Sequence, residues 1–297
     1  MGLVFGLICL ILFVYFIHTI SKAIQVDFIM NSVFHKAAAA LELEERVVGN
    51  THAPFNTNGD AFKYILKNDG NGYLEQVNLS ERQQLARQYK MQLEILVEVG
   101  SFTVEGTPLM KLTKAIDSED GLMEKLQQCF VLRQEEVVMK DYEQGVKQIS
   151  EIAVKALSPG INDPGTALKA IDFLTLLFIR RMKCDERNCL LDEQEQVLVI
   201  DKIILLEELL HRYLSSIRSY GKADLQVNLR LLRCLHSLLN QEPPENKTCM
   251  IRKHAFAVIS DADKAILNSV DRERLNCNIV GINSLLPAEQ WLTELKI

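Results

Sequence analysis

The sequence is poor in the residues that interrupt regular structure, with 7 prolines and 14 glycines in 297 residues. This scarcity excludes collagen-like chains and disordered chains rich in proline and glycine. The 7 cysteines are odd in number and scattered along the chain, which excludes a disulfide scaffold and is typical of compartments where thiols stay reduced. No long apolar run occurs beyond the N-terminal region, so a chain with many membrane spans is also excluded.

Charge is missing from the first 21 residues, of which 16 are apolar. A helix that spans a bilayer needs roughly 20 apolar residues, so this block is long enough to cross a membrane. A secretory signal peptide fits less well, because no basic residue precedes the apolar run and the run exceeds the usual apolar core. A buried core helix is the remaining alternative. Lys22 and Lys36 follow the run, which favours a cytoplasmic location for the rest of the chain.

The chain after residue 21 has the composition of an ordinary globular protein, and we predict an α+β fold that is mostly α. Residues 22–49 are predicted to form a helical stalk that ends at Gly49-Asn50. Residues 50–115 are expected to form a small β-rich module, with strands at 72–77 and 92–99. In the same module, the capping box Ser80–Gln83 should open a helix that reaches Lys90.

Residues 116–297 are predicted to form an α-helical domain with one strand at 196–201. Gly221 is expected to end one of its helices in a left-handed conformation. The predicted helices are Glu119–Gln128, Tyr142–Leu157, Pro164–Lys183, Ile204–Tyr220, Ala223–Asn240, Thr248–Ser269 and Ala288–Leu295.

Three patterns suggest metals or cofactors, and none is complete. Cys184 and Cys189 are spaced too widely for a structural zinc pair. Residues 69–74 copy the middle of a calcium-binding loop, but Lys67 and Asn78 occupy the two positions that should be acidic. Residues 99–109 are similar to a biotinyl- or lipoyl-type hairpin without a lysine at its tip. We therefore predict no cofactor and no metal.

Residues 156–167 form the densest motif, Ala-Leu-Ser-Pro-Gly-Ile-Asn-Asp-Pro-Gly-Thr-Ala. Pro159 should end one helix and Pro164 should begin the next, with Asp163 as its N-cap. A functional interpretation is that Ser158, Asn162, Asp163 and Thr166 form a ligand-binding pocket. A nucleophilic Ser158 would need a nearby base, and the sequence contains no G-x-S-x-G, H-E-x-x-H, Walker or dinucleotide motif.

A basic seam follows two predicted helices that meet at Gly221. It consists of Arg212, Arg218, Arg230 and Arg233, and together with Tyr220 it is a candidate docking surface for lipid phosphates or a partner. The alternative is a solvated face in which the arginines pair with acids such as Glu207 and Glu208. The net charge of −6 argues against nucleic acid, so we predict no nucleic-acid partner.

Several segments together resemble a bacterial family of predicted membrane proteins, domain of unknown function family twenty-two fifty-four. The Ser158–Pro164 heptapeptide is the most specific, and the others are Gly72–Glu75, Val99–Leu109, Ile152–Lys155 and Ile217–Gly221. The resemblance implies an inner-membrane protein with a soluble region and no established activity, so it assigns no catalytic residue. Family members usually have several spanning helices before this region, which implies a truncated form.

Three hypotheses about function follow. The first is a membrane-anchored, non-enzymatic protein whose body binds a ligand or a partner, with the lipid bilayer and a homo-oligomer or another membrane protein as partners. The second is a regulatory cap of an oligomeric transporter or channel. The third is an envelope hydrolase that uses the Ser158–Thr166 loop, although the sequence leans away from an enzyme because no catalytic set is complete.

Overall fold

A computed structural model describes residues 26–48, 62–115, 121–135, 142–184, 189–192, 194 and 196–297, together with residues 4, 6, 8 and 10–14 near the N-terminus. Within this part of the chain, no helix is both long and apolar enough to cross a membrane. The helix predicted over residues 1–21 lies largely outside the described residues, and the Gly49-Asn50 stop predicted for the stalk of residues 22–49 lies outside them too. Both therefore stay predictions.

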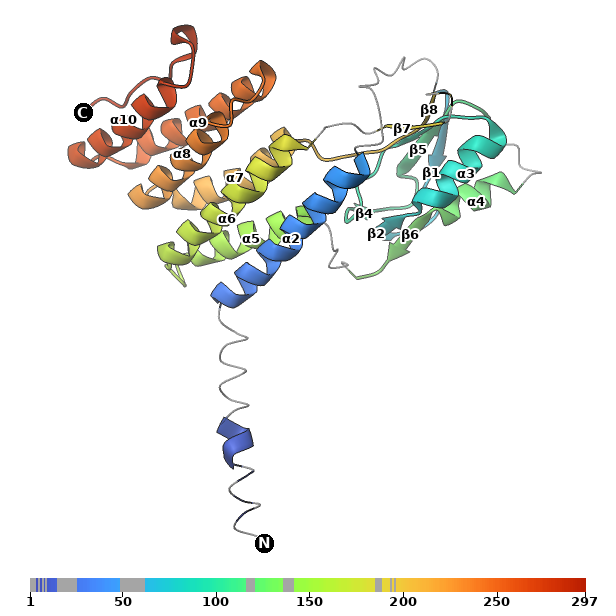
Figure 1. Ribbon diagram of the computed structural model, residues 1–297, viewed down its shortest axis with the longest axis horizontal. Coiled ribbons are helices and arrows are strands. Elements are labelled where there is room, and N and C mark those ends of the chain that lie inside the picture. The colour runs from blue at the N-terminus through green and yellow to red at the C-terminus, as the bar shows by residue number, and fades with distance from the viewer. Residues whose placement is uncertain are drawn as a thin grey trace. The chain divides into compact units, whose positions relative to one another are not determined.

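The chain divides into two compact units, and each is discontinuous in sequence. One unit, which we call the helical unit, contains residues 1–41, 140–183 and 206–297. The other, the α/β unit, contains residues 42–139 and 184–205. Figure 1 shows the elements of both units along the chain. The predicted fold class, α+β and mostly α, is confirmed.

The helical unit is built from α2 and from the helices that follow residue 141. Within it, α8 packs against α6, α9 and α10, while α5 packs against α6 and α7. Its helices are α2 (Val26–Val48), α5 (Tyr142–Ala156), α6 (Pro164–Lys183), α7 (Leu206–Gly221), α8 (Leu225–Leu239), α9 (Glu245–Ala265) and α10 (Ser269–Asn283), followed by the 3₁₀ turn η3 (Ala288–Gln290).

Helix α2 covers the segment expected to be a stalk, and over residues 26–41 it is part of the packed helical unit. Phe34 stacks on Phe173 of α6 with ring centroids 4.8 Å apart. Gly145 of α5 lies so close to α2 that an added Cβ would be 2.4 Å from Cβ of Ala37. Small residues at this crossing let the two helices approach closely.

Over the residues that the structure describes, the α/β unit consists of two sheets with α3 and α4, besides the end of α2. The first sheet has the strand order β1-β5-β3-β8-β7 and the second has the order β4-β2-β6. The elements are β1 (Tyr64–Lys67), β2 (Gly72–Val77), α3 (Leu79–Tyr89), β3 (Leu93–Ile95), β4 (Phe102–Thr103), β5 (Pro108–Leu112), α4 (Leu122–Gln128), β6 (Phe130–Arg133), β7 (Cys189–Leu191) and β8 (Val197–Ile200).

Strands from distant parts of the sequence complete the first sheet. Strand β8, which was predicted, pairs in parallel with β3 through Leu93 opposite Val199. The hairpin expected at residues 99–109 is wrong, because β4 pairs with β2 in one sheet and β5 pairs with β1 and β3 in the other. Gly100 and Gly106, at φ 87° and 85°, supply the turns that redirect the chain between the sheets.

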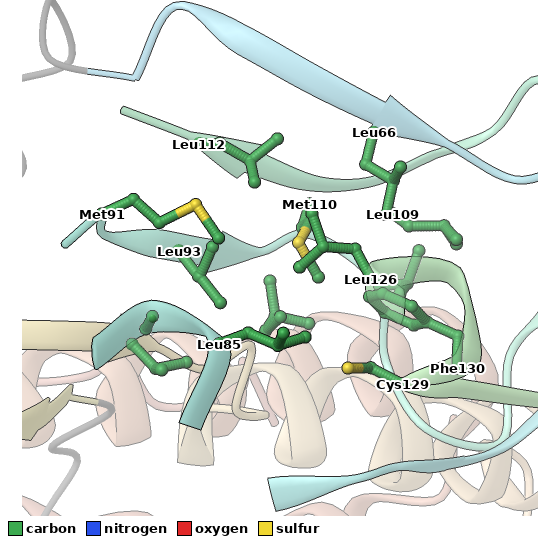
Figure 2. Packing of buried hydrophobic residues seen from close by; sticks show 14 of the residues in the cluster. Leu66, Leu85, Met91, Leu93, Leu109, Met110, Leu112, Leu126, Cys129 and Phe130 are labelled. Carbon is green, nitrogen blue, oxygen red and sulfur yellow. The ribbon is translucent and has the colours of Figure 1, made fainter. Parts of the chain in front are cut away.

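A large apolar core joins the sheets to α3 and α4, beside a smaller buried cluster of Phe62, Cys189, Val197 and Ile200. Leu74, Leu93, Leu109 and Leu126 have no solvent exposure, and Cys129 is equally buried. Figure 2 shows how Leu93, Leu109, Leu126 and Cys129 meet in one cluster with Leu66, Met110 and Phe130. Burial raises the pKa of the Cys129 thiol to about 11, so this cysteine acts as a small apolar residue in the core.

Helix N-termini lie at or near their predicted positions where a side chain next to the helix in sequence caps it. Asp163 is the N-cap of α6 as predicted, and Pro164 is its first residue. The N-cap of α3 is Asn78, two residues before the expected cap Ser80, because the side chain of Asn78 accepts a hydrogen bond from the N–H of Glu81. The side-chain amide of Asn78 in turn donates to the Glu81 carboxylate over 3.1 Å. Its backbone N–H donates to the Cys129 carbonyl oxygen instead, so the reciprocal bond of a capping box is not formed.

The role expected of Gly221 is wrong. It is the last residue of α7, and its backbone is not left-handed. An added Cβ there would lie 2.3 Å from Cγ1 of Val227 and 3.4 Å from Leu157. Glycine is needed at this position because α7, α8 and the end of α5 approach it too closely for any side chain.

The C-terminal region differs most from the prediction. The helix expected over residues 248–269 ends at Ala265, and a separate helix, α10, follows it. Only Ala288–Gln290 of the helix expected over residues 288–295 is helical, as a 3₁₀ turn. Helix α10 was missed because its buried face carries polar residues, Arg272, Asn276 and Asn283, so its sequence has no apolar periodicity.

Candidate functional site

A cleft of about 660 Å³ opens in the α/β unit, where the end of α3 meets the starts of β3 and β8. Because β3 and β8 are parallel, their N-terminal ends lie side by side at one edge of the sheet. The volume is in the range typical of small-molecule sites. Its lining residues are Ala86, Arg87, Lys90, Met91, Gln92, Thr113, Asp192, Gln194, Gln196, Val197 and Leu198.

Local backbone geometry shapes this cleft. Lys90 has a left-handed backbone, φ 48°, that ends α3 and turns the chain toward β3. The N–H of Gln92 donates to the hydroxyl of Thr113 over 2.9 Å, which fixes the strand end on that side. On the other side, one carboxylate oxygen of Asp192 accepts from the backbone N–H groups of Gln194 and Gln196 over 2.9 and 2.8 Å.

The cleft offers positive charge and amide groups to a ligand. Arg87 and Lys90 are exposed, and neither forms an ion pair with any residue that the structure describes. Both lie at the C-terminal end of α3, where cations also balance the negative end of the helix dipole. The carboxylate of Asp192 is already engaged by backbone donors. Glu193 and Glu195 lie outside the described residues.

The four residues predicted to bind a ligand lie together in the exposed connection from α5 to α6, but their hydrogen bonds are local. The Ser158 hydroxyl donates to the carbonyl oxygen of Lys155 over 2.6 Å. Asp163 accepts from the Thr166 N–H over 3.2 Å and from the Thr166 hydroxyl over 2.6 Å. Asn162 has a left-handed backbone, φ 50°, and its N–H donates to the carbonyl oxygen of Ser158.

These contacts explain the lowered pKa of Asp163. The hydrogen bonds from Thr166 hold the pKa of Asp163 below its ordinary value, since they stabilise the carboxylate. No described histidine hydrogen-bonds to Ser158 or to Asp163. The geometry is therefore that of a capped connection between two helices, and no described histidine is placed as the base that a nucleophilic Ser158 would need.

Most arginines of the predicted basic seam form ion pairs inside the helical unit. Arg230 donates to both carboxylate oxygens of Asp172 on α6, over 2.6 and 2.5 Å. Arg218 lies 3.3 Å from the carboxylate of Asp261 on α9. Only Arg233 and Tyr220 keep an exposed side chain with no described ion pair.

Arg212 completes the seam and is also paired. Its guanidinium lies 2.6 Å from Glu208 on the same helix and 3.5 Å from Glu143 on α5. The seam therefore joins helices to one another, and little free positive charge is left on it for lipid phosphates.

A histidine pair lies between α7 and α9. The rings of His211 and His254 are 6.4 Å apart between centroids. Burial lowers the pKa of His254, and the positive groups of His211, Arg218 and Lys253 lower it further, while Glu207 opposes them. In the described part of the chain, no three His, Cys, Asp or Glu side chains are arranged to hold a metal ion.

This pair predicts a pH-dependent stability. Because the native pKa of His254 lies below the unfolded value of 6.5, His254 binds fewer protons in the native state than in the unfolded state. The free energy of unfolding should be unaffected well above that pH and should fall as the pH drops through it. H254Q should flatten this fall in urea titrations at about pH 7.5 and 5.5. H35Q, at an exposed position on α2, should leave it as steep as in the wild type.

The family model for predicted membrane proteins of unknown function, "Predicted membrane protein (DUF2254)", matches residues 1–237. That match covers most of the chain. The chain belongs to this family. The resemblance inferred from the Ser158–Pro164 heptapeptide and its companion segments is therefore confirmed at the level of the family.

Two mycobacterial proteins are also similar to the chain. An uncharacterized protein of Mycobacterium bovis and one of Mycobacterium tuberculosis are each 22% identical over 271 residues. These residues are 87% of this chain and 51% of each relative. The chain thus spans about half the length of the relatives that it matches. No solved structure matches it.

Sequence reasoning missed the cleft altogether. Its lining comes from residues 86–92, 113 and 192–198, and these segments meet only because β3 and β8 pair. The one usable signal was Lys90, a basic residue at the end of a predicted helix, and that pattern also occurs at ordinary helix ends.

Proposed function

We propose that the protein is a membrane-anchored, non-enzymatic binding protein of the plasma (inner) membrane, with one spanning helix and a cytoplasmic body. The uncharged block of residues 1–21 and the basic residues after it support the anchor. Membership of a family of predicted membrane proteins agrees with it. Val26, Phe28 and Ile29, at the start of α2, expose 44, 62 and 42% of their surface, which suits a helix that emerges from a bilayer.

The cleft beside β3 and β8 is the observation that carries the binding function. A small polar ligand with an acidic group suits it, because Arg87 and Lys90 supply positive charge and Gln92, Gln194 and Gln196 supply amides. The loop at Ser158–Thr166 suits this function less, since most of its polar groups already bond to one another. Hydrolysis there finds no support, because Ser158 donates to the Lys155 carbonyl oxygen and no described histidine hydrogen-bonds to it.

The anchor is tested by fractionation of cells that produce the full chain. Replacing Ile8, Ile11 and Val14 by arginine should move most of the protein from the membrane fraction to the soluble fraction, because each buried arginine costs a spanning helix about 3 kcal/mol. The matched variant I8L/I11L/V14L should fractionate as the wild type does. An unchanged distribution for the arginine variant would contradict the anchor.

The cleft is tested by calorimetric titration of the full chain, in detergent, with citrate and with inorganic phosphate as acidic probes. R87Q/K90Q should weaken binding of the probe by about tenfold or more, because it removes both cations of the cleft. The control K67Q/K125Q removes the same charge from exposed positions of the same unit and should bind as the wild type does. Equal losses in both variants would indicate a general charge effect instead of a site.

A further inference from the structure

The segment after α10 is held in an unusual way. Residues 291–297 are neither helix nor strand, yet Leu292 and Leu295 are buried to 4 and 6% exposure. Figure 1 shows this segment, in red, returning from the end of α10 toward the C-terminus. Its backbone pairs with side chains of α10.

Three buried side chains of α10, which we call the polar ladder, make these contacts: Arg272, Asn276 and Asn283. The Asn283 amide donates to the Leu292 carbonyl over 3.0 Å and accepts from its N–H over 2.7 Å. The Asn276 amide pairs with Leu295 in the same two-point manner, over 2.9 and 2.8 Å.

The ends of the segment are fastened by arginines. Arg272 donates to the carbonyl oxygen of Lys296 over 2.6 Å. Arg252 of α9 donates to the carbonyl oxygen of Gln290, also over 2.6 Å. All of these bonds contact the backbone of residues 290–296, so they do not depend on the side chains of that segment.

The spacing of the polar ladder matches a peptide with a three-residue repeat. Asn276 and Asn283 are seven residues apart, which is about 10.5 Å along a helix. Leu292 and Leu295 are three residues apart, which is about 9 Å along a polyproline II-type chain, where groups three residues apart point in the same direction. A helix face with such a repeat can therefore bind an antiparallel extended peptide that has an apolar side chain at every third residue.

Without an occupant this face would be unfavourable. Asn276 and Asn283 would keep buried donors and acceptors without partners, and the sites of two leucines would be empty. Buried asparagines on a helix face are suited to binding a peptide backbone, whereas plain helix packing would favour apolar residues there. Arg272 divides its bonds between the segment and the end of α9, where it contacts Asp263 and the Ile266 carbonyl oxygen.

We propose that the polar ladder of α10 is a peptide-binding face and that residues 290–297 of a second copy of this chain occupy it in exchange for the chain's own segment. An identical segment offers the same two leucines and the same backbone groups, so the exchange preserves every contact and changes only which chain supplies them. Such exchange of identical elements is a low-cost route to a dimer. The chain's own segment competes through its high effective concentration, so pairing increases when that internal contact is weakened.

Complementation between two full-length variants tests the exchange. N276D/N283D has an intact segment but a defective face, because each aspartate loses the amide donor and repels the facing carbonyl oxygen. L292A/L295A has an intact face but a defective segment. Differently tagged forms are mixed in detergent, and the complexes that carry both tags are purified and weighed by light scattering.

The proposal expects the mixture of the two variants to give about tenfold or more complex than either variant alone, because only the mixture contains one intact segment beside one empty face. N278D is the matched control, since Asn278 lies on α10 and donates to the Arg274 carbonyl of its own helix. N278D mixed with L292A/L295A should pair no better than wild type does with L292A/L295A. Absence of complex in the mixture, or equal complex in each variant alone, would overturn the proposal.

A second experiment, with a peptide, tests the same contact and does not require the N276D/N283D variant to fold. A labelled peptide of residues 288–297 should bind the L292A/L295A chain, as measured by fluorescence anisotropy, and the peptide with both leucines replaced by alanine should not. Trp291 is the single tryptophan of the chain, and its emission reports whether the chain's own segment has been released. Failure of the peptide to bind would overturn the proposal, and so would binding of the peptide without any pairing of the chains.

Discussion

Replacing Arg82 by methionine is expected to destabilise the α/β unit by about 3 kcal/mol, because it leaves the carboxylate of Asp201 largely buried and without a counter-charge. The guanidinium of Arg82 contacts both oxygens of that carboxylate, and only 6% of Arg82 is exposed. Burial raises the pKa of Asp201, an effect that Arg82 partly offsets. The loss should therefore be smaller at acidic pH, where the carboxyl group becomes neutral.

Urea unfolding of the R82M variant measures this effect. The double variant R82M/D201L should recover a substantial part of the loss, because it removes both charges together. The control R133M breaks the exposed pair of Arg133 and Glu75 in the same unit and should change the unfolding midpoint far less. Equal effects of R82M and R133M would show that burial of the Arg82–Asp201 pair is not the cause of the destabilisation.

G145A is expected to lower the free energy of unfolding of the helical unit by about 1–3 kcal/mol, although alanine is the better helix former. The added Cβ would lie 2.4 Å from Cβ of Ala37, so α2 and α5 must move apart. That movement also strains the stack of Phe34 on Phe173, which holds α2 to α6.

A second helical glycine provides the matched control for G145A. A Cβ at Gly281 of α10 would meet only ordinary contacts with His236 at 3.8 Å, so G281A should be neutral or stabilising by up to about 1 kcal/mol. A37G in the G145A background removes the clashing Cβ and should restore part of the loss. Equal destabilisation by G145A and G281A would show that close approach of α2 is not the cause. Thermal unfolding followed by circular dichroism provides the measurement.

The predicted site residues and the observed site differ for a clear physical reason. Ser158, Asn162, Asp163 and Thr166 are adjacent in sequence, so their pattern was visible, but adjacency also lets them bond to one another. The lining of the cleft is made by three separate segments whose individual sequences look ordinary. Proximity of distant residues is the property that a single sequence does not display.

The sequence alone determined the local features of this protein. It placed α2, α5, α6 and β8 within a few residues of their observed bounds, because apolar periodicity, prolines and caps act over one or two helical turns. It also identified the family through the residues around Ser158–Pro164. Those signals are short-range and need no knowledge of neighbouring elements.

Only the tertiary structure decided the features on which binding is proposed to depend. It brought β8 beside β3, buried Arg82 against Asp201, and gave Gly221 a packing role in place of a left-handed turn. It also explained the polar face of α10, whose asparagines bind the backbone of a distant segment. In each case the partner lies outside the local turn, so the physical reason for the residue becomes visible only once the chain has folded.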